Sequence, residues 1–262
     1  MRLCTFEVAG HLGRHWRVGA FRDGRIIDLN FATAWHLSQQ GESEPQHLAN
    51  ALAPSSMLEF LRAGLRALHT SEQLFASAGP HPLDWWKLEI PPRGPNDETL
   101  VHLPGQVRLC APVPHPARLG TDEDVRFTEK VEPELKFAAV IGKEGMKVGA
   151  LEARGYIAGF TAMNDFGARC SALGPCLVTP DEIGNPYALQ ICVRINGEEF
   201  GRTTSRRLRP KFENTIESLT SHDVILPGDV IAFPIDVDPP VKCGDVIELE
   251  IEKIGTLRTR VV

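Results

Sequence analysis

Apolar residues along this chain follow two different periods, and the change between them divides the sequence. Over residues 29–40 and 57–78, apolar side chains recur every three or four positions, which predicts helices. Before them, short apolar runs surround the dipeptide Asp23-Gly24, a pattern typical of a β-hairpin. From about Gln106 onward, apolar residues alternate or form short runs bounded by turn residues, which predicts mainly strands.

These patterns predict an α+β protein with two parts. We expect a small N-terminal domain over residues 1–77, a proline-rich connecting segment over 78–105 and a mixed-β domain over 106–262. The length of 262 residues allows either one large domain or two smaller ones. Few helices are expected between the strands, and no G-x-G-x-x-G follows a predicted strand, so a doubly wound nucleotide-binding fold is disfavoured.

Composition narrows the class of protein further. The 34 acidic residues outnumber the 28 basic ones, and the net charge of −6 gives no electrostatic reason to expect a nucleic-acid partner. No apolar run approaches the roughly 18 residues of a membrane-spanning helix, and the first ten residues lack the shape of a signal peptide. The six cysteines form no C-x-x-C pair. We therefore expect a reduced, cytoplasmic protein that binds neither nucleic acid nor membrane.

Three acidic residues occupy positions from which their side chains could meet. Side chains alternate between the faces of an extended strand, so Glu132 and Glu134 point the same way, and Asp165 ends the next apolar strand. Neighbouring carboxylates repel unless a cation lies between them, and an all-oxygen cluster suits Mg2+ before Mn2+ or Ca2+. The alternative is a solvated strand face, with Asp165 as the N-cap of a helix.

Four other residues are weaker candidates for the site. Lys130 could line the same cavity or simply balance the charge of the acids, and His115 could act as a base or belong to a turn between two prolines. Arg206 and Arg207, in the basic run GRTTSRRLRPKF, could grip a substrate carboxylate with paired N–H groups. Otherwise these arginines would lie on a solvated or subunit-contact face.

Five phrases occur in one order along the chain: EPELKFAAVIGKEG, GYIAGFTAMNDFGAR, LGPCLVTPDEI, INGEEF and LPGDVIAF. In this order they resemble the motifs of the fumarylacetoacetate hydrolase family, over roughly residues 108–262. The resemblance implies a mixed-β domain of that type, a homodimer, and a divalent ion, usually Mg2+, on the acids that match Glu132, Glu134 and Asp165. In such enzymes the ion chelates a 1,3-dicarbonyl or 2-oxo acid and stabilises an enolate.

The chain also departs from the pattern of this family. Hydrolytic members carry a lid with a His-x-x-Glu motif that activates water, whereas here only TDEDVRFTEKV separates the preceding LCAPVPHPARLG from Glu132. A lysine-bearing segment of the family is missing after NDFGAR, and Phe233 and Pro234 stand where Thr and Gly would be expected. The sequence therefore leaves the catalytic residues unassigned.

The sequence supports three hypotheses about function. The first is a metal-dependent enzyme of this family that acts on a small β-dicarbonyl or 2-oxo acid through a metal-stabilised enolate, with C–C bond hydrolysis as the usual outcome. The second keeps the enolate without hydrolysis and predicts an isomerase, decarboxylase, dehydratase or cyclase. The third is a non-catalytic subunit or binding module. The missing lid weighs against hydrolysis, and the three acids weigh against an inactive scaffold.

Overall fold

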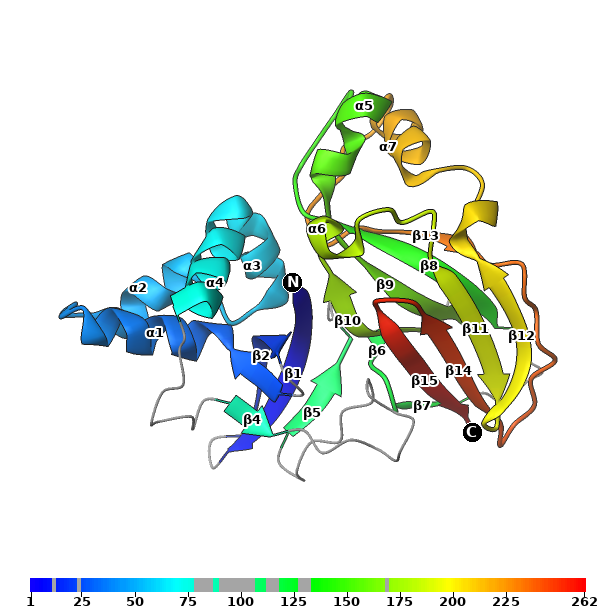
Figure 1. Ribbon diagram of the computed structural model, residues 1–262, viewed down its shortest axis with the longest axis horizontal. Helices are drawn as coiled ribbons and strands as arrows, with labels where there is room; N and C mark the ends of the chain where they lie inside the picture. The colour runs from blue at the N-terminus through cyan, green and yellow to red at the C-terminus, as the bar shows by residue number, and fades with distance from the viewer. Residues whose placement is uncertain are drawn as a thin grey trace. The chain divides into compact units, whose positions relative to one another are not determined.

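The computed structural model describes residues 1–10, 13–22, 25–77, 87–89, 107–111, 118–126, 133–167 and 170–262. The chain divides into two compact units (Figure 1). The first comprises Met1 and Leu3–Leu109, and the second comprises Arg2 and Cys110–Val262. Within the part of the chain that is described, no helix is long and apolar enough to cross a membrane.

The first unit begins with the predicted antiparallel sheet. Its strands are β1 (Arg2–Gly10), β2 (Gly13–Arg22) and β3 (Arg25–Asp28), paired in this order. Two short strands extend the sheet: β4 (Lys87–Glu89) pairs with β3, and β5 (Val107–Cys110) pairs with β1. The hairpin at β2 and β3 is confirmed, while β4 lies in the segment that was expected to be irregular.

Four helices follow the hairpin: α1 (Leu29–Gln39), α2 (Pro45–Leu52), α3 (Met57–Ala63) and α4 (Leu65–Ser77). The helix predicted over 57–78 is in fact two helices. Gly64 separates them because its φ of 61° lies in the left-handed region that favours glycine, and its N–H donates to the carbonyl of Leu61.

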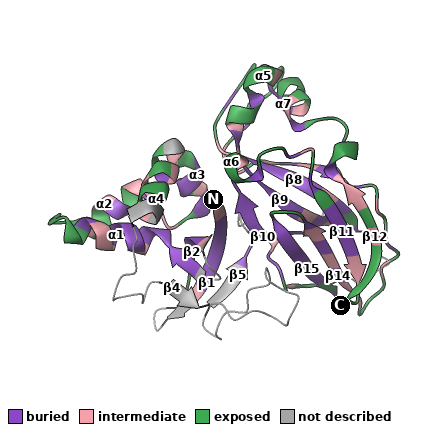
Figure 2. Cartoon of the chain, in the orientation of Figure 1, coloured by how far each residue is buried: buried purple, intermediate pink, exposed green. Residues whose placement is uncertain are grey.

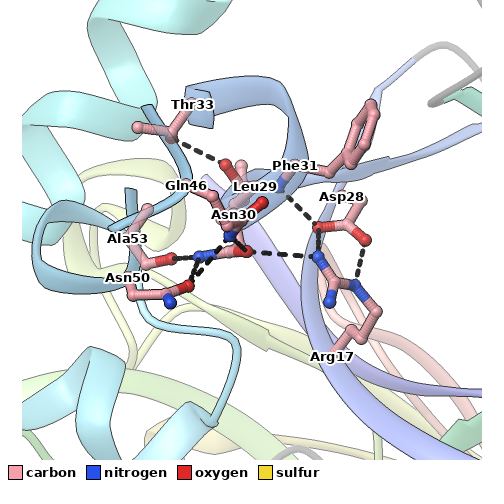
Figure 3. A network of polar contacts seen from close by, with 9 residues as sticks. All are labelled: Arg17, Asp28, Leu29, Asn30, Phe31, Thr33, Gln46, Asn50 and Ala53. Carbon is pink, nitrogen blue, oxygen red and sulfur yellow. Dashed lines mark hydrogen bonds and ion pairs between the residues drawn. The ribbon is translucent and has the colours of Figure 1, made fainter. Parts of the chain in front are cut away.

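A partly buried polar network joins α1 and α2 to strand β2 (Figure 3). Asp28 caps α1 by accepting the N–H of Phe31 at 3.0 Å, and Arg17 forms an ion pair with the same carboxylate. Asn30 donates to the carbonyl of Ala53 at 2.9 Å and to Asn50, and its own oxygen accepts from Gln46. Because Asn30 has all its hydrogen bonds within the protein, we interpret this network as structural.

The second unit contains two sheets (Figure 1). In the first sheet, β13 (Val230–Pro234), β8 (Glu134–Ile141), β9 (Ile157–Asp165) and β10 (Ser171–Val178) are antiparallel neighbours in that order, and β6 (Arg118–Leu119) runs parallel to β10. The second sheet has the order β12 (Glu198–Thr204), β11 (Gln190–Ile195), β14 (Val246–Ile251), β15 (Gly255–Val261) and β7 (Asp124–Val125).

The two sheets of this unit pack on each other, since β9 and β10 contact β15. A buried hydrogen bond crosses between them, from Asn164 to the hydroxyl of Thr259 at 3.0 Å. Figure 2 shows β8, β9 and β10 buried over most of their length, whereas β12 is largely exposed. Strand β8 is therefore held between β13 and β9 in the interior of its sheet.

Short helical segments complete the second unit. They are α5 (Ala150–Ala153), the 3-10 turn η2 (Arg154–Tyr156), α6 (Pro180–Ile183), the 3-10 turn η3 (Ser205–Arg207) and α7 (Phe212–Thr220). Helix α7 is anchored by its first residue, Phe212, which is fully buried. The ring of Phe212 lies 5.5 Å from Phe137, 5.6 Å from Phe160 and 4.9 Å from Phe233. These contacts attach α7 to strands β8, β9 and β13.

Candidate functional site

The pairing of β8 with β9 brings two of the predicted acids together. Glu134 begins β8 and lies directly across from Asp165, which ends β9. Lys136 lies two residues further along β8, on the same face as Glu134, because side chains of a strand alternate between its faces. The next position on β9 that shares this face is Met163, directly opposite Lys136.

The ammonium group of Lys136 lies between the two carboxylates. Its Nζ is 2.8 Å from Glu134 Oε2 and 2.5 Å from Asp165 Oδ2. The Lys136 and Asp165 side chains are 15% and 22% exposed, whereas Glu134 is 65% exposed, so solvent reaches this group from the Glu134 side. We call these three residues the Glu134–Lys136–Asp165 cluster.

The carboxylate of Asp165 is also held by its own backbone. Its Oδ1 accepts the N–H of Gly167 at 3.0 Å, while Oδ2 receives Lys136. The N–H of Phe166, between Asp165 and Gly167, donates to the carbonyl of Cys170 at 3.0 Å and closes the turn. Asp165 is therefore fixed by a local turn on one side and by a cross-strand cation on the other.

Lys136 keeps its proton, and with it its positive charge, well above neutral pH. Burial lowers the pKa of Lys136, but the hydrogen bonds and charges of Asp165 and Glu134 outweigh burial, and the pKa is raised above the ordinary value of 10.5. The stability that this pair of contacts contributes is fully present below pH 10.5 and is lost as the pH rises through the raised pKa. At neutral pH Lys136 is thus a cation between two anionic groups.

The end of β13 flanks the cluster on the other side of β8. Pro234 lies directly opposite Lys136, and the N–H of Ile235 donates to the carbonyl of Leu135 at 2.9 Å. The following residue, Asp236, lies 3.9 Å from the guanidinium of Arg207. One of the predicted arginines is therefore at the same end of the sheet as Lys136.

Cys170 is the titratable thiol nearest to Asp165 in sequence. Burial raises the pKa of Cys170, and the negative charges of Glu123 and Asp165 raise it further. The thiol therefore stays protonated at neutral pH and is a poor nucleophile.

The structure describes four of the seven predicted site residues. Glu134 and Asp165 are brought together, whereas Glu132, Lys130 and His115 lie outside the described residues. Arg206 and Arg207 are exposed on η3, beside a hollow of only about 10 Å³ that is lined in part by Arg207, Pro234 and Asp236. Their role in binding substrate stays a prediction.

Lys136 is the residue that the sequence reasoning missed. The alternation of side chains that puts Glu132 and Glu134 on one face of a strand also puts Lys136 on that face. The signal was available in the sequence, because Lys136 stands alone as a charged residue within the apolar run LKFAAVI. A charge in such a run needs a partner of opposite sign.

A larger hollow lies in the first unit, away from these acids in the sequence. It has a volume of about 400 Å³ and is lined by His15, Trp16, Arg17 and Ser55. Arg17 is already paired with Asp28, and the indole N–H of Trp16 donates to Glu7 at 3.2 Å. Two of its four lining side chains are thus engaged by the protein, and we do not assign the site there.

The donor set of the cluster can be compared with the needs of a divalent ion. Mg2+ and Mn2+ require oxygen ligands with available lone pairs, and an ammonium group has none. Among the residues that are described, no group of three or more His, Cys, Asp or Glu side chains could hold a metal ion. The two described acids, Glu134 and Asp165, are bridged by Lys136, and two carboxylates beside an ammonium group make a poor donor set for such an ion.

Comparison with known proteins gives the family. Residues 95–262 match the family model described as the C-terminal domain of fumarylacetoacetate (FAA) hydrolase. The chain therefore belongs to the fumarylacetoacetate hydrolase family, as its ordered motifs predicted, and the predicted α+β fold is confirmed.

Relatives in this family carry out different reactions. The chain is 27% identical over 311 residues to the human protein named oxaloacetate tautomerase FAHD2B, mitochondrial, covering 100% of the chain and 92% of that protein. It is 33% identical over 137 residues to 2-dehydro-3-deoxy-D-arabinonate dehydratase of Saccharolobus solfataricus, covering 42% of the chain and 46% of the dehydratase. The alignment with the human protein is longer than the chain itself, so the human protein carries positions that have no counterpart here.

A solved structure shows the same fold. The maleylpyruvate hydrolase of Sphingobium sp. SYK-6, in complex with manganese (II) ion and pyruvate, superposes with a TM-score of 0.72. The two are 20% identical, and the match covers 100% of this chain and 99% of the hydrolase. The human relative is named as a mitochondrial protein, and the cytoplasmic location expected for this chain stays a prediction.

Proposed function

We propose that this chain is an enzyme that moves a proton between carbon and oxygen of a small 2-oxo acid, a keto–enol isomerisation that proceeds through an enolate. The observation that carries the proposal is the Glu134–Lys136–Asp165 cluster at the solvent-reached end of β8 and β9. Family membership supports it, because the human relative that aligns with the whole chain is named an oxaloacetate tautomerase.

The chemistry of the cluster suits this reaction. When a base removes the proton from the carbon next to the keto group, negative charge develops on the keto oxygen, and a fixed cation stabilises it. Lys136 supplies that cation and can donate a hydrogen bond to the oxygen. Glu134 is 65% exposed and can exchange protons with solvent, so it is our candidate for the base. The proton leaves carbon and returns to oxygen, and no water is consumed.

Two further properties belong to this proposal. The substrate would be a small anionic molecule, with Arg207 near Asp236 as the candidate to hold a second carboxylate, and the active species would be a homodimer, as the family resemblance implies. Both rest on the sequence predictions together with the position of η3.

Hydrolysis of a C–C bond is the second candidate. The structural relative that is named a hydrolase favours it, and in that form the ion predicted at Glu132, Glu134 and Asp165, Mg2+ or Mn2+, would take part. The sequence lacks the His-x-x-Glu lid that activates water in hydrolytic members, and general-base assistance is worth about a hundred- to ten-thousand-fold in rate. We therefore expect hydrolysis to be slow.

Proton exchange in deuterated water separates these possibilities. Pyruvate, oxaloacetate and acetylpyruvate would be incubated with the protein, with Mg2+ in one series and with a chelator in another, and followed by proton NMR. We expect loss of the proton signal next to the keto group at a rate above that of buffer alone, without cleavage.

Each other outcome has a defined meaning. Rapid cleavage of acetylpyruvate would show a hydrolase and contradict the proposal. No exchange on any substrate in either series would favour the non-catalytic subunit or binding module. Lys136→Met, which removes the cation of the cluster, should slow the exchange. Lys147→Met is its control, because Lys147 is an exposed lysine outside the cluster and carries the same charge.

A further inference from the structure

We infer that Lys136 is a built-in cation that replaces a divalent metal ion in the site of this chain. The inference deepens the proposed function, because it names the positive group that faces the substrate, and it rests on that function for its catalytic meaning. The positional evidence comes from the structure alone.

The first line of argument is position. Lys136 Nζ is within 2.8 Å of Glu134 and 2.5 Å of Asp165, so it occupies the space that a bridging ion would take between these two carboxylates. The same acids were predicted from the sequence to share a cation. The structure brings the two described acids together and places a cation of the protein itself between them.

The second line of argument is that Lys136 cannot easily leave. Its backbone is in the middle of the sheet, opposite Pro234 of β13 and Met163 of β9, and its side chain is 15% exposed. Every residue of β8 from Leu135 to Ile141 is buried except Lys136 itself. Moving the ammonium away from both acids would break two ion pairs of a lysine that is mostly buried, which is unfavourable unless another partner is found.

The third line of argument is charge balance. An ion of charge +2 that entered beside Glu134 and Asp165 would meet the positive charge of Lys136 at the same place. Like charges at such separations repel, so the ammonium offsets part of the attraction that the two acids would exert on the ion. The lysine therefore opposes metal binding and at the same time neutralises part of the negative charge of Glu134 and Asp165.

Lys136 also gives the site a different chemistry from that of a metal centre. An ion can accept two oxygens of a substrate at once, whereas an ammonium offers three hydrogen-bond donors, of which Glu134 and Asp165 engage two. The remaining donor is free to bind one substrate oxygen, from the side where Glu134 is exposed. Such a site favours a small 2-oxo acid bound through a single oxygen at this point.

Binding of Mn2+ tests the inference without any substrate. The full-length protein would be titrated with Mn2+ and the free ion measured by electron paramagnetic resonance, with the melting temperature followed in parallel. For the unaltered protein we expect the same free-ion signal as for Glu134→Ala, and no rise in melting temperature when Mn2+ is added. We expect Lys136→Glu, which adds a third carboxylate, to bind Mn2+ and to show a saturable rise.

The controls make every outcome decisive. Lys147→Glu makes the same charge change at an exposed lysine outside the cluster and should behave like the unaltered protein. Lys136→Met keeps the length of the side chain without the charge and should gain some Mn2+ affinity. It replaces Lys136→Glu in the experiment if that variant does not fold. Mn2+ binding by the unaltered protein that Glu134→Ala abolishes would overturn the inference, and so would folded Lys136 variants that bind no Mn2+. Because no turnover is measured, failure of the proposed function would leave this result intact.

Discussion

The variant Lys136→Met is expected to lower the rate of proton exchange on a 2-oxo acid by about a hundred- to a thousand-fold. Removal of one preorganised donor from a developing oxyanion typically has an effect of this size. Methionine retains most of the side-chain volume but cannot donate to the keto oxygen, so the loss would fall on the reaction step. The rate of deuterium incorporation measured by NMR gives the result directly.

Two matched variants show whether the charge and its position both matter. Lys136→Arg keeps the charge in a planar, bulkier group and should recover only part of the rate. Lys147→Met removes an exposed lysine and should leave the rate unchanged. If Lys136→Met folds normally by circular dichroism and still exchanges at the full rate, Lys136 does not act on the reacting oxygen.

The second large effect is on stability. Phe212→Ala should lower the free energy of unfolding by about 3–5 kcal/mol, because it removes a fully buried ring from the core. The ring is within 5.6 Å, between centroids, of Phe137, Phe160 and Phe233, so helix α7 would lose its attachment to three strands. Urea unfolding followed by circular dichroism measures the change.

Leu219→Ala is the matched control for this experiment. Leu219 lies on the same helix and is 47% exposed, so little apolar surface would be lost from the core. We expect a change within about 0.5 kcal/mol, since surface substitutions of this kind are usually small. Equal losses in the two variants would mean that α7 is not anchored by Phe212.

Much of the fold could be predicted because its signals are local. The alternation and short runs of apolar residues after Gln106 predicted mainly strands, and β8, β9, β11, β13 and β14 lie there. The Asp23-Gly24 dipeptide predicted the hairpin. Strands β6 and β7 were not predicted, because two residues each are too short to show a period. Helix α7 was also missed, since its position is fixed by the contacts of Phe212 with distant strands.

The candidate site could be predicted in part. The family motifs selected Glu134 and Asp165, and the structure shows them directly opposite one another. The sequence could not show which cation lies between them, because that depends on the register of β8 and β9 and on the reach of the Lys136 side chain. A lysine within an apolar strand predicts a partner of opposite charge, and the structure shows two, Glu134 and Asp165.

The most direct test is a crystal structure of the protein grown with Mn2+ and oxalate, a stable analogue of the enolate of a 2-oxo acid. The anomalous scattering of manganese locates that ion without reference to any model of the site. Our account predicts no anomalous peak between Glu134 and Asp165, the ammonium of Lys136 between the two carboxylates, and oxalate against Lys136. A manganese peak bound by Glu132, Glu134 and Asp165, with Lys136 turned away, would contradict it.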